Sequence, residues 1–129
     1  MSHPIKFAKV GVSGARDAKN FPVMRNILDL YHKRHGIGFV VTGDAGGADA
    51  FAVHWAKQNE VSRTIFAARW SQFDKEAGPL RNQLIAEEAD LLIAFPGPDS
   101  TGTWDTIDRF EKMGKPVYAF ETDGRTIKL

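Results

Sequence analysis

Short runs of β-branched and apolar residues alternate along this chain with longer runs whose apolar residues recur at helical spacing. This alternation is typical of stacked βαβ units that build a parallel sheet. It predicts strands at 7–13, 38–42, 63–68, 91–95 and 116–120, and helices at 22–35, 48–58, from 79 onward and at 103–113. Residues 126–129 follow a tight-turn signal and are expected to form a short antiparallel edge.

The expected fold class is therefore α/β. We expect a single Rossmann-like three-layer domain over residues 1–129, with a parallel sheet of about five strands. The apolar spacing also predicts which side chains of the last two helices face the sheet. These inward side chains are Leu80, Leu84, Ile85, Ala89, Trp104, Ile107 and Phe110.

The composition excludes several kinds of site and partner. The 129 residues include no cysteine, which rules out disulfides, thiolate zinc sites and cysteine nucleophiles. The 4 histidines are not spaced with carboxylates as metal ligands, so no metal site is expected. Because 17 Lys and Arg are interspersed with 16 Asp and Glu, a nucleic-acid-binding surface is not expected. The sequence shows neither a membrane span nor a secretory signal, so the expected location is the cytoplasm.

Three glycine-rich loops follow predicted strands. Right-handed crossovers place such loops at the carboxyl edge of the sheet, and a strand order of 3-2-1-4-5 makes the first and fourth loops neighbours. Glycine lets the backbone approach a ligand closely, and free N–H groups at helix starts attract anions. The alternative is that these glycines only make tight turns. The candidate ligand contacts in these loops are Gly11, Ser13, Gly14, Arg16, Gly43, Gly46, Gly47, Asp49, Pro96, Gly97, Thr101, Gly102 and Thr103.

The segment after the third strand reaches the same edge. Trp70 is a candidate for stacking on a base, with core or lid packing as the alternative. Lys75 is either a phosphate contact or a solvated surface lysine. Arg81 and Asn82 begin a helix, where a basic residue opposes the helix dipole, so Arg81 needs an anionic partner. The expected partners are a ligand phosphate or carboxylate, Asp99 and Asp105.

Four segments together resemble the YspA/YpsA-related branch of the SLOG superfamily. They are V-S-G-A-R-D, G-D-A-G-G-A-D-A, W-x4-K-x-A-G-P-x-R-N and A-F-P-G-x-x-S-T-G-T, within residues 10–117. The resemblance implies a Rossmann-like fold that binds nucleotides or nucleotide derivatives. The superfamily also includes the Lonely Guy phosphoribohydrolases and the DNA-processing protein A.

In the Lonely Guy enzymes an arginine and a glutamate flank the ribose phosphate. The resemblance places that arginine on Arg81 and the glycine–threonine pair of those enzymes on Gly102 and Thr103. The glutamate position falls on Thr106, with Asp105 one residue before it. One residue along a helix rotates a side chain by about 100°, so Asp105 is not a direct replacement.

The leading hypothesis is a domain that binds a nucleoside phosphate, ADP-ribose or NAD-like molecule, as a sensor or carrier. The alternative is an N-glycosidase that acts on a nucleotide, with Arg81, Asp105 and Asp99 as catalytic residues. A nucleic-acid-binding protein is the third hypothesis. No cofactor is required, and Mg²⁺ would enter only with a bound phosphate. A homodimer would use Trp104, Phe110 and Met113, with core packing as their alternative role.

Overall fold

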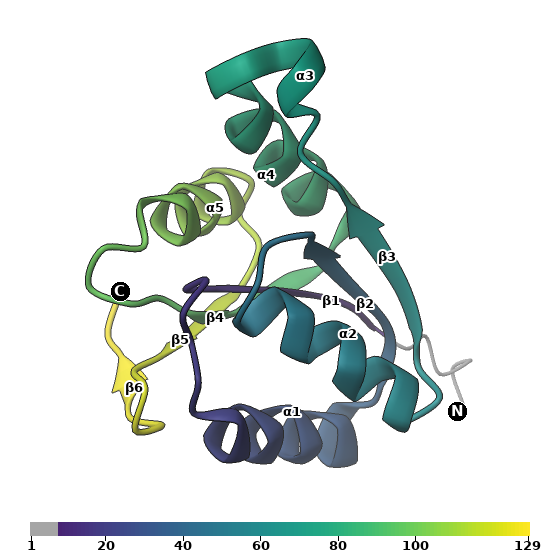
Figure 1. The fold of residues 1–129 in the computed structure, drawn as a ribbon. Coiled ribbons are helices and arrows are strands. Elements are labelled where there is room, and N and C mark those ends of the chain that lie inside the picture. The colour runs from purple at the N-terminus through teal and green to yellow at the C-terminus, as the bar shows by residue number, and fades with distance from the viewer. Residues whose placement is uncertain (1–7) are drawn as a thin grey trace.

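The computed structural model describes residues 8–129, except for the side chains of residues 70 and 71. Its elements alternate as the sequence predicts (Figure 1). They are β1 (Ala8–Gly14), α1 (Phe21–His35), β2 (Ile37–Gly43), α2 (Ala48–Gln58), β3 (Ser62–Phe66), α3 (Trp70–Phe73), the 3₁₀ turn η1 (Asp74–Glu76), α4 (Ala77–Glu88), β4 (Leu91–Phe95), α5 (Thr101–Lys112), β5 (Val117–Phe120) and β6 (Thr126–Ile127).

One sheet with the order β3-β2-β1-β4-β5-β6 forms the centre of this α/β domain. The strands β1 to β5 pair in parallel, and β6 pairs antiparallel with β5. The predicted order of the five parallel strands and the antiparallel edge are therefore confirmed. The order reverses between β1 and β4, so the loops that follow these strands lie side by side.

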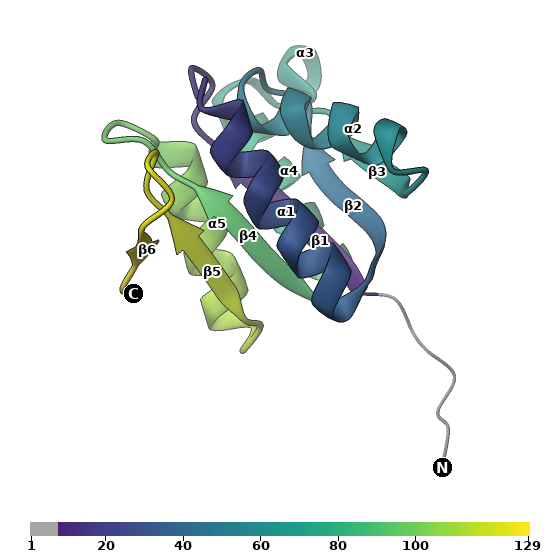
Figure 2. The ribbon, with the colours of Figure 1, turned by 90° about the horizontal axis from the view of Figure 1, so that it is seen from below.

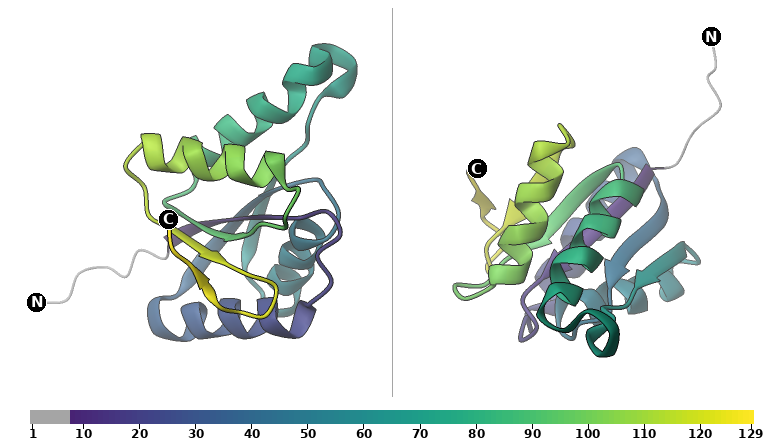
Figure 3. Two further views of the ribbon diagram at one scale, coloured as in Figure 1. Left: turned by 90° about the vertical axis from the view of Figure 1, so that its left-hand side faces the viewer. Right: turned by 90° about the horizontal axis from the view of Figure 1, so that it is seen from above.

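Helices cover both faces of the sheet. The helices α1 and α2 lie on one face, and α4 and α5 lie on the other (Figures 1, 2 and 3). Alternate residues of the central strands supply a separate core on each face. Leu91, Ile93 and Phe95 of β4 pack under α1 and α2, whereas Leu92 and Ala94 pack under α4 and α5. This double burial explains the continuous apolar run of β4.

The fully buried ring of Phe110 fills the space above Gly11 in β1. A Cβ atom on Gly11 would lie 3.0 Å from Cζ of Phe110 and 3.3 Å from Cβ of Ala89. Gly11 therefore lets α4 and α5 approach the centre of the sheet. Phe110 belongs to this core, which removes it from the residues that could reach a partner chain.

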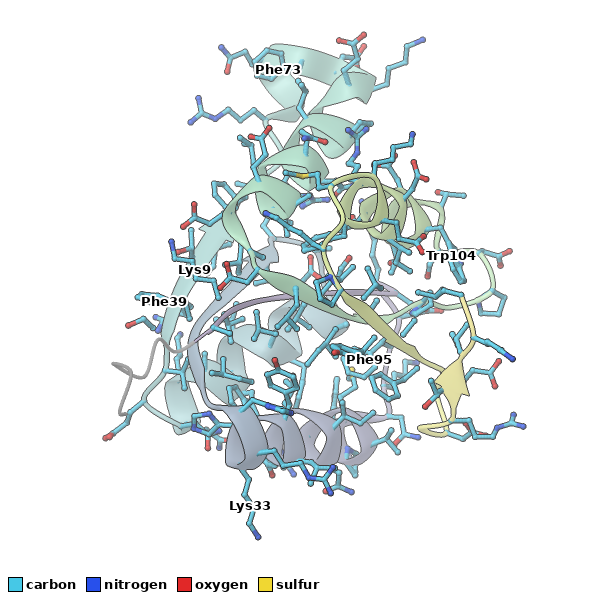
Figure 4. The ribbon with its side chains drawn as sticks, turned by 180° about the vertical axis from the view of Figure 1, so that it is seen from behind. Lys9, Lys33, Phe39, Phe73, Phe95 and Trp104 are labelled. Carbon is cyan, nitrogen blue, oxygen red and sulfur yellow. The ribbon has the colours of Figure 1, made fainter. Side chains whose placement is uncertain are left out.

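Three side chains predicted to face the sheet do not do so. Leu80, Leu84 and Trp104 are 45%, 47% and 40% exposed, and Trp104 lies at the periphery of the molecule (Figure 4). Ile85 and Ala89 are buried as predicted, and Asn82 also lies on the buried side of α4. The remaining buried residues of this helix are Ala77, Gly78 and Ala86, whose small side chains give a weaker apolar signal than Leu80 and Leu84.

The short helix α3 and the turn η1 precede α4 and project beyond the sheet, with Phe73 at the projecting end (Figures 1 and 4). The helix predicted from residue 79 consequently begins earlier, at Ala77. No helix in the described part of the chain is long and apolar enough to cross a bilayer.

Replacing Phe110 by alanine should lower the free energy of unfolding by about 3–5 kcal/mol, because the change empties the space between Gly11 and α5. Urea unfolding monitored by circular dichroism would measure this loss. The control is Trp104→Ala, for which we expect a loss of at most about 1 kcal/mol because that ring is partly exposed. Equal losses would contradict the assignment of Phe110 to the core.

Candidate functional site

A cavity of about 660 Å³ opens at the carboxyl edge of the sheet, between the loops that follow β1 and β4 and the start of α4. Its volume lies within the range of small-molecule sites. Twelve of the side chains and glycines predicted from the sequence line it. These are Ser13, Gly14, Arg16, Asp49, Arg81, Asn82, Gly97, Asp99, Thr101, Gly102, Thr103 and Asp105.

Other predicted residues lie elsewhere. Gly46 lines a smaller adjoining hollow of about 230 Å³, which shares Arg16, Ala45 and Arg81 with the main cavity. The side chain of Trp70 lies outside the described residues. The predicted contacts that line neither space are Gly11, Gly43, Gly47, Pro96 and Lys75. Residues of the wall that sequence reasoning missed are Ala15, Asp17, Ala45, Gly78, Pro79, Ile85, Pro98 and Ser100.

Gly14 and Gly47 hold the loops together. A Cβ atom on Gly14 would lie 2.6 Å from Cβ of Ala48 and 2.8 Å from the carbonyl oxygen of Phe95. Gly47 has a φ of +62°, and a Cβ there would overlap the carbonyl oxygen of Ala15. That same oxygen accepts the N–H of Ala48 at 3.3 Å. Both glycines therefore position the walls of the cavity. Gly14 also lines the cavity, whereas Gly47 does not.

The first turn of α5 presents free backbone donors. Ser100 does not cap this helix, because its Oγ instead accepts the N–H of Gly97 at 2.8 Å. Among the residues that the structure describes, the N–H groups of Gly102 and Thr103 have no protein acceptor. Both residues line the cavity, so this helix start can receive an anion there.

Arg81 crosses from α4 to the end of β2. Its Nη1 donates to Oδ1 of Asp44 at 3.0 Å and its Nε donates to Oδ1 of Asn82 at 2.9 Å. The side chain is only 11% exposed, and Nη2 has no acceptor among the described residues. The expectation that Asp99 or Asp105 pairs with Arg81 is wrong. Asp44 is its partner because Gly43, beside it, lacks a side chain and leaves room for the guanidinium.

Asn82 links α4 to α5. Its Nδ2 donates to Oδ2 of Asp105 at 3.0 Å and to the carbonyl oxygen of Gly102 at 3.3 Å. Asp105 also accepts Nε of Arg109 at 2.8 Å. Burial alone would raise the pKa of Asp105, but the hydrogen bonds from Arg109 and Asn82 outweigh it, so the pKa lies below its usual value. The Asp105 carboxylate therefore stays ionised in the cavity wall.

The pKa of Asp49 is shifted in the opposite direction to that of Asp105. It is 5% exposed and its Oδ2 accepts the N–H of Ala45 at 3.3 Å. Burial raises the pKa of Asp49 to about 6, although the charge of Arg81 opposes this shift. One cavity thus contains a carboxylate that favours ionisation and another that retains a proton into the mildly acidic range.

The described residues show no cluster of metal ligands. Within residues 8–129, leaving aside the side chains of residues 70 and 71, no three His, Asp or Glu side chains are grouped to hold an ion. The chemistry of the site therefore consists of two arginines, Arg16 and Arg81, free backbone donors and several carboxylates.

The raised pKa of Asp49 predicts a pH-dependent stability. The folded state holds the proton more tightly than the unfolded state, so the stabilisation that Asp49 contributes is fully present below about pH 4 and is lost as pH rises through about 6. The shift from 3.8 to about 6 corresponds to about 3 kcal/mol. Relative to Asp49→Asn, the wild-type protein should lose this amount between pH 4 and 7 in urea unfolding. Parallel pH profiles for the two proteins would contradict the burial of an ionisable Asp49.

Comparisons with known proteins agree with this architecture. The model of the YspA, cpYpsA-related SLOG family matches residues 8–73, just over half of the chain. The Gene 61 protein of Mycobacterium phage D29 is 33% identical over 120 residues, which cover 87% of this chain and 95% of that protein. The solved DNA processing protein A of Streptococcus pneumoniae superposes with a TM-score of 0.74 at 20% identity over 90% of this chain. The chain spans about half of that structure, 51% of its length, and the likeness concerns the fold. The chain therefore belongs to the YspA, cpYpsA-related SLOG family.

Proposed function

We propose that the cavity binds a nucleotide or nucleotide derivative and that the protein acts as a sensor or carrier of this ligand. The observation that carries the proposal is that Arg81, with its unused Nη2, and the open first turn of α5 line the same cavity. Asn82 fixes these two groups relative to each other, because it bonds to Arg81 and to the carbonyl oxygen of Gly102. A phosphate between them would receive donors from both.

The remaining wall suits the rest of a nucleotide. Pro79, Ile85 and Pro98 supply apolar surface, which a base requires. A charge-assisted hydrogen bond contributes about 1.5–3 kcal/mol and the helix dipole about 0.3–1 kcal/mol. Association costs about 4 kcal/mol or more, so a phosphate alone would bind weakly. Contacts to the sugar and the base must therefore supply most of the net affinity and the selectivity.

An N-glycosidase is the second candidate, favoured by the ionised Asp105 in the wall. A fixed carboxylate can stabilise the positive charge that develops on a sugar ring when its bond to the base breaks. Thr106 occupies the position of the Lonely Guy glutamate, and this argues against an N-glycosidase. It is fully buried and its hydroxyl donates to the carbonyl oxygen of Gly102. Binding without turnover therefore remains the first proposal.

Nucleic acid is the third candidate partner. The similarity to a DNA processing protein concerns the fold, and the formal net charge of this chain is only +1. A gel-shift assay at low salt would detect such binding, and a retarded species that survives added mononucleotide would favour it over the first proposal.

A thermal-shift panel tests the first proposal. It would contain AMP, GMP, CMP, UMP, ADP-ribose and NAD near millimolar concentration. A ligand at 100 times its dissociation constant adds about 2.7 kcal/mol, which raises the melting temperature by several degrees. Arg81→Gln should weaken the best ligand about 10- to 100-fold in titration calorimetry, because charged donors are lost. The control Arg34→Gln, exposed at the end of α1, should bind normally. No shift with any ligand would reject the proposal.

Base release tests the second candidate. The ligand found in the panel would be incubated with the protein and the products separated by chromatography. If the protein is an N-glycosidase, Asp105→Asn should reduce the release of free base about 100-fold or more, since it removes the charge opposite the sugar. Full activity in that variant would show that Asp105 has no catalytic role, and the absence of free base with wild-type protein would leave binding as the function.

A further inference from the structure

Asp44 and Asp49 share the single positive charge of Arg81. Asp44 pairs directly with Nη1 of Arg81, and Asp49 lies beside the same guanidinium above Gly43. The ideal Cβ position of Gly43 is 2.5 Å from Nη1 of Arg81 and 2.8 Å from Oδ2 of Asp49. With both carboxylates ionised, these three side chains together carry one net negative charge.

This charge count conflicts with the proposed ligand. A phosphate that reaches the free Nη2 of Arg81 would bring a further negative charge next to a carboxylate that is almost fully buried. Like charges at short range in a poorly solvated site cannot all remain ionised. Asp44 is exposed and already held by Arg81 and the N–H of Ala68. Asp49 is almost fully buried, and the N–H of Ala45 at 3.3 Å and the Thr42 side chain are its hydrogen-bond partners. Asp49 is therefore the group that can change its ionisation most readily.

The surrounding charged groups do not remove the conflict. Arg16 and Asp17 enter the cavity wall from the loop after β1, and Asp99 and Asp105 enter it from the side of α5. Arg16 and Arg81 are thus outnumbered by acidic side chains along the wall. Since Arg109 and Asn82 stabilise Asp105 as an anion, that residue does not accept a proton in place of Asp49.

We propose that Asp49 takes up a proton when an anionic ligand binds to Arg81, and that its hydroxyl then donates a hydrogen bond to the ligand. This inference rests on the proposed nucleotide-binding function and adds a residue that couples affinity to pH. It is consistent with the raised pKa of Asp49 in the free protein, because the proton is already held more tightly than in an ordinary aspartate. By linkage, ligand affinity must fall as pH rises above the range in which free Asp49 titrates.

Titration calorimetry with ADP-ribose and AMP would test the coupling. Experiments at pH 7 in two buffers of different ionisation enthalpy give the number of protons taken up on binding. The phosphates of ADP-ribose are diesters that stay ionised over this range, and the AMP phosphate contributes equally to all variants. We expect the wild-type protein to take up more than half a proton beyond Asp49→Asn, and its affinity for ADP-ribose to fall severalfold from pH 6 to 8. The control Asp108→Asn alters an exposed carboxylate paired with Lys112, and should behave as wild type.

The outcomes separate this inference from the proposed function. If a probe binds and wild type and Asp49→Asn take up the same number of protons, the role of Asp49 is wrong and the binding function stands. If neither these probes nor any other nucleotide of the thermal-shift panel binds, both proposals fail. Should Asp49→Asn not fold, carbon NMR of the wild-type Asp49 carboxyl with and without AMP replaces it. An upward shift of its titration midpoint on binding supports the inference, and an unchanged midpoint overturns it.

Discussion

Arg81 can lie over the end of β2 because Gly43, the last residue of that strand, has no side chain. The last residue of β1, Gly14, plays the matching role on the other face of the sheet, where Ala48 of α2 occupies the space of the missing Cβ. The two terminal glycines thus let α2 and α4 approach the strand ends more closely than any other residue would allow. The cavity lies between these elements, so its walls depend on both close approaches.

Hydrogen bonds then fix the polar side of the cavity. A continuous series runs from Asp44 through Arg81 and Asn82 to Asp105 and Arg109. It joins the loop after β2 to α4 and α5, and every buried side-chain polar atom of the described residues has a partner. Such a satisfied network holds its members in one geometry. A ligand that meets Arg81 would therefore encounter a donor whose orientation is already set, which reduces the cost of ordering on binding.

The sequence allowed the order of the elements to be predicted because the apolar periods of strands and helices differ. The limits of α2 and β4 are those that the residue pattern predicts. The same signal failed on α4, where Leu80 and Leu84 are exposed and Asn82 is buried. Periodicity detects large apolar residues, so it overlooks a buried face that combines small side chains with one asparagine of the site.

The partner of Arg81 could not be chosen from the sequence. Asp44, Asp99 and Asp105 all follow strands at the carboxyl edge or begin the next helix, and only distances separate them. A signal for Asp44 was present, because it directly follows the last glycine of β2. The glycine pattern of that loop predicts backbone donors and gives no role to Asp44.

The buried Asp49 lowers the stability of the folded protein when its carboxylate is ionised. An asparagine would keep the shape of the side chain and an acceptor for the N–H of Ala45 without placing an ionisable group in a buried position. The folded state is destabilised whenever the Asp49 carboxylate is ionised, as its raised pKa requires. Unfavourable ionisation of this kind is concentrated at functional sites. Its location beside Arg81 in the cavity wall supports the proposal that this destabilisation is tied to an anionic ligand of Arg81.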